Sequence, residues 1–270
     1  MNLYISDLDG TLLDSNAKLS NYTKSILKEL IEDGLNFSIA TARTPATVVP
    51  ILSDIDIKLP VVVMNGAAIY DIENNKYIKF NSIPSKSVDK LISILSENDV
   101  SALSYTLCDN HINAYYDRIN NPVEEKFIKD RTGSPHKTFI NASIPKDSNV
   151  LYFLLLNEKD LIMDIFNKVK DIEGIYAIAY KDVYNDGFYN LEIYSNKSSK
   201  ANSIKEIMSL FNFDRLISFG DNLNDIPMFE ISDECYAVEN AAKDIKDIST
   251  SIIDSNSNDG VIKYLKSISL

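Results

Sequence analysis

Three short apolar segments near the start of the chain each give way abruptly to polar residues. The segments cover residues 3–5, 36–40 and 61–64, and the polar residues that follow them include Asp7, Thr41 and Asn65. Apolar runs of this length are typical of buried strands. The carboxyl ends of parallel strands meet at the edge where such sheets bind ligands. The pattern therefore predicts an α/β fold with a parallel sheet and one polar edge.

Apolar residues at helical spacing connect these strands. Residues 19–34 carry apolar side chains three or four positions apart, with Ser20 or Asn21 as the cap and Gly34 as the end of the helix. The same alternation returns in the last third of the chain. There we expect a helix over residues 200–211, strands over 216–219 and 235–238, and a final helix near 261–265. The two ends of the sequence therefore belong to one sheet domain.

The middle of the chain has a different pattern. A hairpin over residues 68–80 precedes helices near 85–97 and 158–170, strands near 100–107, 111–116, 150–156, 175–180 and 189–194, and polar segments over 122–148. Runs of strands with helices between them are typical of an α+β module. We therefore expect a core of residues 1–81 and 191–270, interrupted by an inserted domain of residues 82–190.

Composition and charge exclude several classes of function. The 270 residues are 45% apolar and 24% charged, as in ordinary globular proteins, and the formal net charge of −12 would repel nucleic acids and anionic membranes. No basic segment precedes an apolar core at the N-terminus, and no apolar run reaches the ~18 residues of a membrane span. Cys108 and Cys235 are too few for a disulfide framework and lack the spacing of a zinc site. We therefore predict a reducing, cytoplasmic setting.

The segment from Asp7 to Thr11, Asp-Leu-Asp-Gly-Thr, has more than one interpretation. It is compatible with a polar turn whose side chains cap a helix. It does not fit a calcium loop, whose glycine is the sixth residue, because Gly10 is the fourth residue from Asp7. In an extended segment, residues i and i+2 point to the same side, so Asp7 and Asp9 can also face one ligand. Several carboxylates in one cleft would then require protonation or a bound cation.

Later segments decide between these interpretations. Asp-x-Asp-Gly-Thr after an N-terminal strand resembles the first motif of the haloacid dehalogenase superfamily of phosphohydrolases, and Thr41, Lys200 and residues 220–225 match its other motifs in order. The similarity to the Cof-type phosphatases of this superfamily also includes residues 63–67, 191–193, 238–241 and 259–261. The resemblance implies a Rossmann-like core with a parallel sheet and an inserted α+β cap domain of the type called C2B.

The resemblance also implies a chemistry that these residue types suit. Hydrolysis of a phosphate monoester is so slow without an enzyme that a catalyst must lower the barrier by ~20 kcal/mol or more. A carboxylate nucleophile divides the reaction into two steps through an aspartyl-phosphate. By resemblance, Asp7 is this nucleophile. Asp9 would protonate the leaving alkoxide and then deprotonate the attacking water.

Metal and phosphate ligands follow from the same resemblance. Mg²⁺ would be bound by a carboxylate oxygen of Asp7, the backbone carbonyl of Asp9 and the carboxylate of Asp221, with Asp225 orienting them from behind. The phosphoryl oxygens would be bound by the Thr41 hydroxyl, the Leu8 and Ala42 backbone N–H groups, the Lys200 ammonium and the Asn224 amide. Lys197 is a rival to Lys200, although a solvated loop charge would also explain it. Lys200 is preferred because it opens the predicted helix and follows Glu192 at the spacing of the family.

Some residues depart from the family pattern or stand outside it. Ala42 and Ala201 occupy positions where glycine is usual in the family. These two differences leave the local backbone geometry open, but the charged residues of the motifs are all present. His111 and His136 are expected to have surface or packing roles, because the mechanism needs no imidazole. The tyrosines of the middle segment, among them Tyr105, Tyr115 and Tyr116, fit a β-sheet, and one or two could face a substrate.

The sequence thus predicts a Mg²⁺-dependent phosphatase of small phosphorylated metabolites, with sugar phosphates first and flavin mononucleotide or pyridoxal phosphate next. The inserted domain is expected to set substrate choice, because the phosphate chemistry is the same for every monoester. Two alternatives stay open. A phosphomutase would use the same nucleophile and return the phosphoryl group to a sugar. A catalytically inactive metabolite-binding regulator would keep the fold without turnover.

Overall fold

The computed structural model describes residues 1–182 and 185–268, which fall into two compact units. The first, here called the core unit, comprises Met1–Lys79 and Ser199–Leu270, and the second, here called the inserted unit, comprises Phe80–Ser198. The sequence analysis assigned residues 191–198 to the core. They belong to the inserted unit because strand β11 (Phe188–Ser195) pairs with two strands of that unit's sheet.

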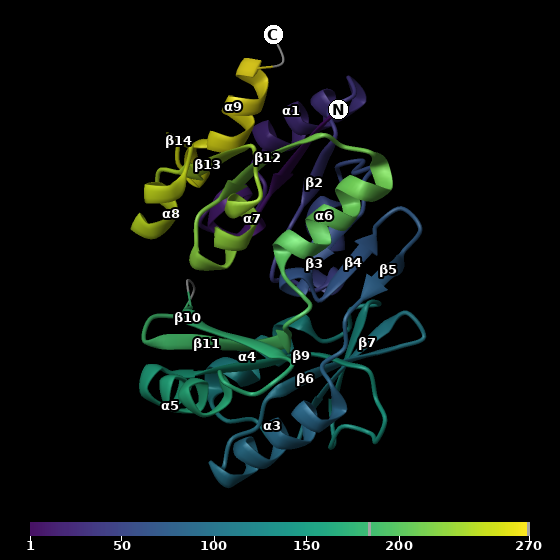
Figure 1. Cartoon of the computed structure of the whole chain (residues 1–270), viewed down its shortest axis with the longest axis vertical. Coiled ribbons are helices and arrows are strands. Elements are labelled where there is room, and N and C mark those ends of the chain that lie inside the picture. Colours follow the sequence, from purple (N-terminus) through teal and green to yellow (C-terminus); the bar gives the residue numbers. More distant parts are fainter. Residues whose placement is uncertain (183–184, 269–270) are drawn as a thin grey trace. The chain divides into compact units, whose positions relative to one another are not determined.

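A parallel sheet organises the core unit (Figure 1). Its strand order is β14-β13-β12-β1-β2, and the strands are β1 (Asn2–Ser6), β2 (Phe37–Ile39), β12 (Arg215–Gly220), β13 (Glu234–Val238) and β14 (Ser251–Ile253). Strand β2, which follows β1 in the chain, lies on one side of β1, and β12, β13 and β14 lie on the other side. The predicted α/β fold is confirmed, and the β1–β12 boundary is the switch point where such sheets bind ligands.

Helices cover both faces of this sheet. They are α1 (Asn21–Glu32), α2 (Pro45–Leu52), α6 (Lys200–Phe211), α7 (Ile226–Glu230), α8 (Lys243–Ile248) and α9 (Gly260–Ile268). The Ser20 hydroxyl caps α1 by accepting a hydrogen bond from the Thr23 N–H, and the apolar residues at helical spacing are buried. Contacts pair α1 with α9 and α6 with α7. Right-handed crossovers place these pairs on opposite faces, because the strand order reverses at β1.

A small antiparallel sheet extends the core unit beyond β2. It contains β3 (Val61–Val63), β4 (Ala68–Asp71) and β5 (Lys76–Phe80), and a parallel bridge between Ala40 and Val62 joins it to β2. The turn after β3 lies against the start of α6. A Cβ atom built on Gly66 would lie 2.2 Å from the Ser199 carbonyl oxygen. The backbone after β3 therefore packs directly against the backbone at the start of α6.

The inserted unit is built on a six-stranded sheet with the order β10-β11-β9-β6-β7-β8. Its elements are α3 (Ser85–Glu97), β6 (Leu103–Cys108), β7 (His111–Tyr116), α4 (Pro122–Arg131), β8 (Lys137–Asn141), β9 (Val150–Glu158), α5 (Lys159–Val169), β10 (Ile175–Lys181) and β11. Side chains of α3 and α5 form its hydrophobic core with one face of the sheet. The sequence analysis treated residues 122–148 as polar segments and missed both α4 and β8.

Tyrosines line the other face of this sheet. Tyr105, Tyr152, Tyr194 and Tyr176 are cross-strand neighbours in four adjacent strands, with ring centroids 5.4–5.9 Å apart. As predicted, these residues and Tyr115 and Tyr116 lie in strands. Near one end of the row, the Lys137 ammonium is buried among aromatic rings, 5.1 Å from the Tyr105 ring centroid and 4.7 Å from that of Phe139.

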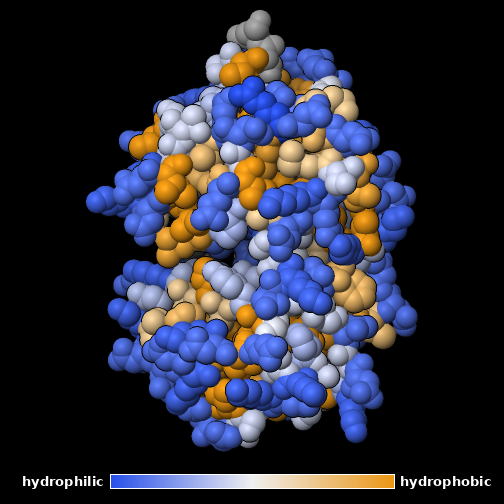
Figure 2. All heavy atoms as spheres, in the orientation of Figure 1, coloured by the Kyte–Doolittle hydropathy of each residue, from blue (hydrophilic) through white to orange (hydrophobic). Residues whose placement is uncertain are grey.

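The surface visible in Figure 2 is mainly hydrophilic, with apolar side chains scattered over it. Among residues 1–182 and 185–268, no helix is long and apolar enough to span a membrane.

The packing of Gly66 leads to a first prediction. Gly66 (φ +92°) and Gly34 (φ +98°) share a left-handed backbone, but a Cβ on Gly34 would meet no atom within 4 Å. Gly34→Ala therefore introduces only the backbone strain, whereas Gly66→Ala must also displace the backbone of Ser199. We expect Gly66→Ala to lower the free energy of unfolding by about 1–3 kcal/mol more than Gly34→Ala, measured by urea unfolding. Equal losses would contradict this packing.

The burial of Lys137 leads to a second prediction. Burial, with a smaller contribution from the Arg131 charge, lowers the pKa of Lys137 to about 7. The folded state therefore disfavours the protonated amine. The resulting loss of folding stability is complete below pH 7, where the lysine is protonated in both states, and it decreases as the pH rises towards the ordinary lysine pKa. Lys137→Met should raise the free energy of unfolding at pH 6 and raise it less at pH 9, with a slope of at most about 1.4 kcal/mol per pH unit.

The exposed Lys126, on α4, provides the control for this experiment. Lys126→Met should change the free energy of unfolding equally at both pH values. A gain from Lys137→Met that does not depend on pH would show that Lys137 is not buried as an unpaired amine.

Candidate active site

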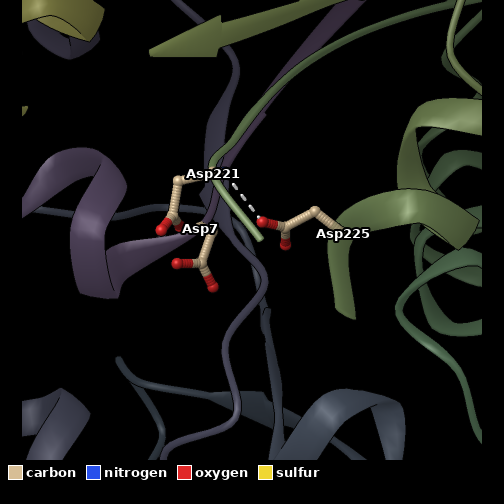
Figure 3. Close-up of side chains that lie close together, drawn as sticks. All are labelled: Asp7, Asp221 and Asp225. Atoms are coloured by element: carbon tan, nitrogen blue, oxygen red, sulfur yellow. Dashed lines mark hydrogen bonds between the residues drawn. The ribbon is translucent and has the colours of Figure 1, made fainter. Parts of the chain in front are cut away.

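Two carboxylates lie side by side at the switch point of the core sheet. Asp7 follows β1 and Asp221 follows β12, and these strands are hydrogen-bonded neighbours. The Asp7 N–H donates to the Phe219 carbonyl at 3.0 Å, which continues the ladder to the end of the strands. Figure 3 shows the two side chains next to each other. The parallel register therefore brings together two residues that are far apart in the sequence.

Asp225 completes a cluster of three carboxylates. One oxygen from each of Asp7, Asp221 and Asp225 lies within 4.8 Å of the others. Asp225 Oδ2 accepts the backbone N–H groups of Asp221 (2.9 Å, dashed in Figure 3) and Asn222 (3.1 Å). These bonds fix the loop after β12 and orient Asp221 from behind.

Lys200 connects two members of the cluster. Its ammonium donates to Asp7 Oδ1 and Asp225 Oδ1, both at 2.6 Å, and its side chain is 1% exposed. Lys200 is the first residue of α6, and the Ser199 hydroxyl caps this helix by accepting from the Asn202 N–H. Burial lowers the pKa of Lys200, but the charges of Asp225 and Asp7 outweigh this and raise it. Lys200 is therefore a permanent cation between two carboxylates.

One ammonium does not neutralise three carboxylates. Burial, followed by the charges of its acidic neighbours, raises the pKa of Asp7 well above the usual aspartate range despite the opposing effect of Lys200. Burial and the Asp225 charge likewise raise the pKa of Asp221 to about 7. A bound divalent cation would reverse both shifts because it favours the ionised carboxylates.

The hydrogen bonds leave oxygen atoms available for such a cation. Asp7 Oδ1 is occupied by Lys200, and Asp221 Oδ1 accepts the Thr11 hydroxyl at 2.9 Å. Asp7 Oδ2 and Asp221 Oδ2 accept no hydrogen bond from any residue that the structure describes. Hard divalent cations prefer carboxylate oxygens of this kind, so the donor set fits a metal such as Mg²⁺.

The predicted phosphate ligands occupy the loops after β1 and β2. Thr41 is buried, and its hydroxyl accepts the Arg43 N–H at 3.2 Å. The backbone N–H groups of Leu8 and Ala42 donate to no acceptor in the described part of the chain. An acceptor outside the protein could therefore bind to both N–H groups, as the prediction requires.

The end of β3 supports two of these groups, a role that the sequence analysis did not assign to it. The Asn65 N–H donates to the Thr41 carbonyl at 3.0 Å, and Asn65 Oδ1 accepts the Asn224 amide at 3.2 Å. Met64 and Asn65 both have positive φ angles, 51° and 52°. This backbone is sparsely populated for residues other than glycine. The Asn65-Gly66 dipeptide was the available sequence signal.

Arg43 is the charged residue that the sequence analysis missed. Its guanidinium donates from Nε to Asp9 Oδ2 at 2.6 Å and from Nη2 to Asp9 Oδ1 at 2.5 Å. The structure therefore places the Asp9 carboxylate in a bidentate ion pair. The signal for this pair was the position of Arg43 in the same strand-end loop as Thr41.

Comparisons with known proteins show what this chain is similar to. The family model described as haloacid dehalogenase-like hydrolase matches residues 4–265. A protein of Buchnera aphidicola (subspecies Baizongia pistaciae) is 32% identical over 97% of this chain and 96% of its own. The phosphatase YwpJ of Bacillus subtilis is 26% identical over 98% of this chain and 99% of its own.

Two further proteins extend the comparison. A 5-amino-6-(5-phospho-D-ribitylamino)uracil phosphatase of Bacillus subtilis, YwtE, is 25% identical over 96% of this chain and 95% of its own. The solved structure of a subclass IIB sugar phosphatase of the haloacid dehalogenase superfamily has a TM-score of 0.78 at 19% identity, over 100% of this chain and 99% of that one. At 19% identity, the similarity to this solved structure shows the fold alone. The chain described here belongs to the haloacid dehalogenase-like hydrolases of the Cof type, a family whose named relatives are phosphatases.

Proposed function

We propose that this protein is a Mg²⁺-dependent phosphatase of small phosphorylated metabolites and that Asp7 is its nucleophile. The observation that carries the proposal is the buried cluster at the switch point, where Asp7, Asp221 and Asp225 share a single lysine. This arrangement concentrates negative charge beside one fixed cation. It is therefore suited to a metal and a phosphoryl group, and no other described residues form a comparable acidic cluster.

The first step transfers the phosphoryl group to the protein. Asp7 attacks phosphorus through a carboxylate oxygen, and the bond from phosphorus to the leaving oxygen breaks. Asp9 gives a proton to that oxygen, so the leaving group departs as an alcohol. This step requires Asp9 to exchange its ion pair with Arg43 for a proton beforehand. The product of this step is an aspartyl-phosphate on Asp7.

The second step regenerates the enzyme. Asp9, now ionised, accepts a proton from a water molecule, and the water oxygen attacks phosphorus. The bond between phosphorus and Asp7 breaks, and inorganic phosphate leaves. One carboxyl group therefore serves first as an acid and then as a base.

The cation would be bound by carboxylate oxygens of Asp7 and Asp221 and the backbone carbonyl of Asp9, and it would stabilise negative charge on the phosphoryl oxygens. Asp225 orients this set through the two backbone N–H groups that it accepts. The Thr41 hydroxyl, Lys200, the Asn224 amide and the N–H groups of Leu8 and Ala42 complete the ligands of the phosphoryl group.

The substrates that we propose are sugar phosphates and phosphorylated cofactors such as flavin mononucleotide or pyridoxal phosphate. One relative is named for a phosphate that carries a ribityl chain on a uracil ring, which belongs in the same size range. The net charge of −12 disfavours nucleic acids as substrates. Both cysteines are unpaired, which is consistent with the proposed cytoplasmic location.

The experiment that tests this proposal measures phosphate release from a panel of small phosphates, including para-nitrophenyl phosphate, with Mg²⁺ or with EDTA. We expect turnover only with the metal and none from Asp7→Asn, because an amide is a poor nucleophile. Millimolar Mg²⁺ should also raise the melting temperature, since it binds the folded state. Turnover by Asp7→Asn above a few per cent would contradict the assignment of the nucleophile. A stable bisphosphate product would favour the phosphomutase alternative.

A further inference from the structure

The Thr11 hydroxyl occupies one of the two carboxylate oxygens of Asp221. It donates to Asp221 Oδ1 at 2.9 Å, whereas Asp221 Oδ2 accepts no hydrogen bond among the residues that the structure describes. Asp225, the neighbour of Asp221 in the cluster, already uses both of its oxygens for Lys200 and two backbone N–H groups. Asp221 is therefore left with a single oxygen to offer to a cation, and Thr11 imposes this limit.

The turn after β1 holds the Thr11 hydroxyl in a fixed direction. Thr11 is buried, and a β-branched side chain has few accessible χ1 rotamers. The peptide that precedes it is also fixed, because the Asn240 amide donates to the Gly10 carbonyl at 2.8 Å. The Leu13 N–H donates to the Leu8 carbonyl at 2.9 Å and closes the turn. The hydrogen bond to Asp221 therefore starts from a rigid donor.

The residue before Thr11 contacts the same carboxylate. Gly10 has a φ of +77°, and a Cβ atom built on it would lie 2.4 Å from Asp221 Oδ2 and 2.9 Å from Asp221 Cγ. The Asp221 carboxylate thus packs directly against the Gly10 backbone, while it accepts the hydrogen bond from Thr11. These two contacts from adjacent residues restrict its rotation, so the turn after β1 determines which Asp221 oxygen remains available.

The number of oxygens that a carboxylate offers distinguishes two common hard cations. Ca²⁺ takes about six to eight oxygen ligands and accepts both oxygens of one carboxylate. Mg²⁺ is smaller and requires a nearly ideal octahedron. The two oxygens of one carboxylate lie too close together to occupy neighbouring corners of that octahedron. A carboxylate with one available oxygen therefore suits Mg²⁺ and gives Ca²⁺ one ligand fewer than it accepts.

We propose that Thr11 is a positioning residue for Asp221 that shifts the preference of the metal site towards Mg²⁺ and away from Ca²⁺. The inference rests on the proposed function, in which Asp7 and Asp221 bind a divalent cation. It assigns to Thr11 no contact with the cation or with the phosphoryl group. Without the Thr11 hydroxyl, both Asp221 oxygens become available, and Ca²⁺ gains a ligand that Mg²⁺ does not use.

The experiment measures the dissociation constants of Mg²⁺ and Ca²⁺ from the rise in melting temperature of the EDTA-treated full chain with cation concentration. For Thr11→Val, we expect the ratio of the Ca²⁺ to the Mg²⁺ dissociation constant to fall about 10-fold or more. Thr11→Ala should shift this ratio in the same direction, and Thr11→Ser, which keeps the hydroxyl, should leave it unchanged. The ratio is the informative quantity, because a general loss of order or a change in local charge alters both affinities alike.

Thr23 offers a matched control. Like Thr11 it is 1% exposed, and its hydroxyl donates to a carboxylate oxygen, Asp259 Oδ1, at 2.8 Å. It lies in α1 of the core unit, and Asp259 is not a member of the acidic cluster. Thr23→Val should therefore lower the melting temperature without changing the ratio of the two dissociation constants. If Thr11→Val melts too low for the titration, the comparison is made with Thr11→Ala.

Three outcomes would overturn the inference. An unchanged ratio in Thr11→Val and Thr11→Ala, while the wild type binds Mg²⁺, would show that Thr11 does not influence the choice of cation. An equal shift in Thr11→Ser would show that the hydroxyl is not the cause, and an equal shift in Thr23→Val would attribute the effect to lost stability. A wild type whose melting temperature responds to neither cation would contradict the metal site of the proposed function itself.

Discussion

The shortage of positive charge at the switch point is the constraint on which the rest of the site depends. Three carboxylates and one ammonium are buried together, and the pKa values of Asp7 and Asp221 are raised as a consequence. An unpaired charge in such surroundings costs several kcal/mol. The site therefore favours any ligand that adds positive charge. This is the physical reason to expect a divalent cation there, independently of family resemblance.

The fold supplies this cluster from segments that are distant in the sequence. Asp7 and Lys200 are 193 positions apart, and the whole inserted unit lies between them in the chain. The chain returns to the core unit at Ser199, whose backbone lies against the Gly66 turn. From there α6 begins with Lys200, and the Ser203 hydroxyl donates to the Gly66 carbonyl at 3.0 Å. The turn after β3 therefore positions the lysine as well as Asn224.

The sequence predicted the features that local patterns determine. The strand ends at Asp7 and Thr41 could be located because short apolar runs stop there, and α6 begins at the residue that was expected. The inserted unit was harder to predict. Helix α4 and strand β8 lie in a polar stretch with weak periodicity. Strand β11 pairs with its neighbour β10 and also with β9, from which a helix and a strand separate it in the chain. The sequence analysis also missed the Arg43–Asp9 ion pair, because no spacing rule relates residues of two separate loops.

The central claim is that a phosphoryl group is carried on Asp7, and trapping that intermediate tests it most directly. A substrate labelled in its phosphoryl group is mixed with the protein and Mg²⁺ and then quenched with acid within the first turnover. We predict labelled protein whose label is released by hydroxylamine and maps to the peptide that contains Asp7, and no label on Asp7→Asn. Product release without any labelled wild-type protein, or label on a different residue, would contradict the account.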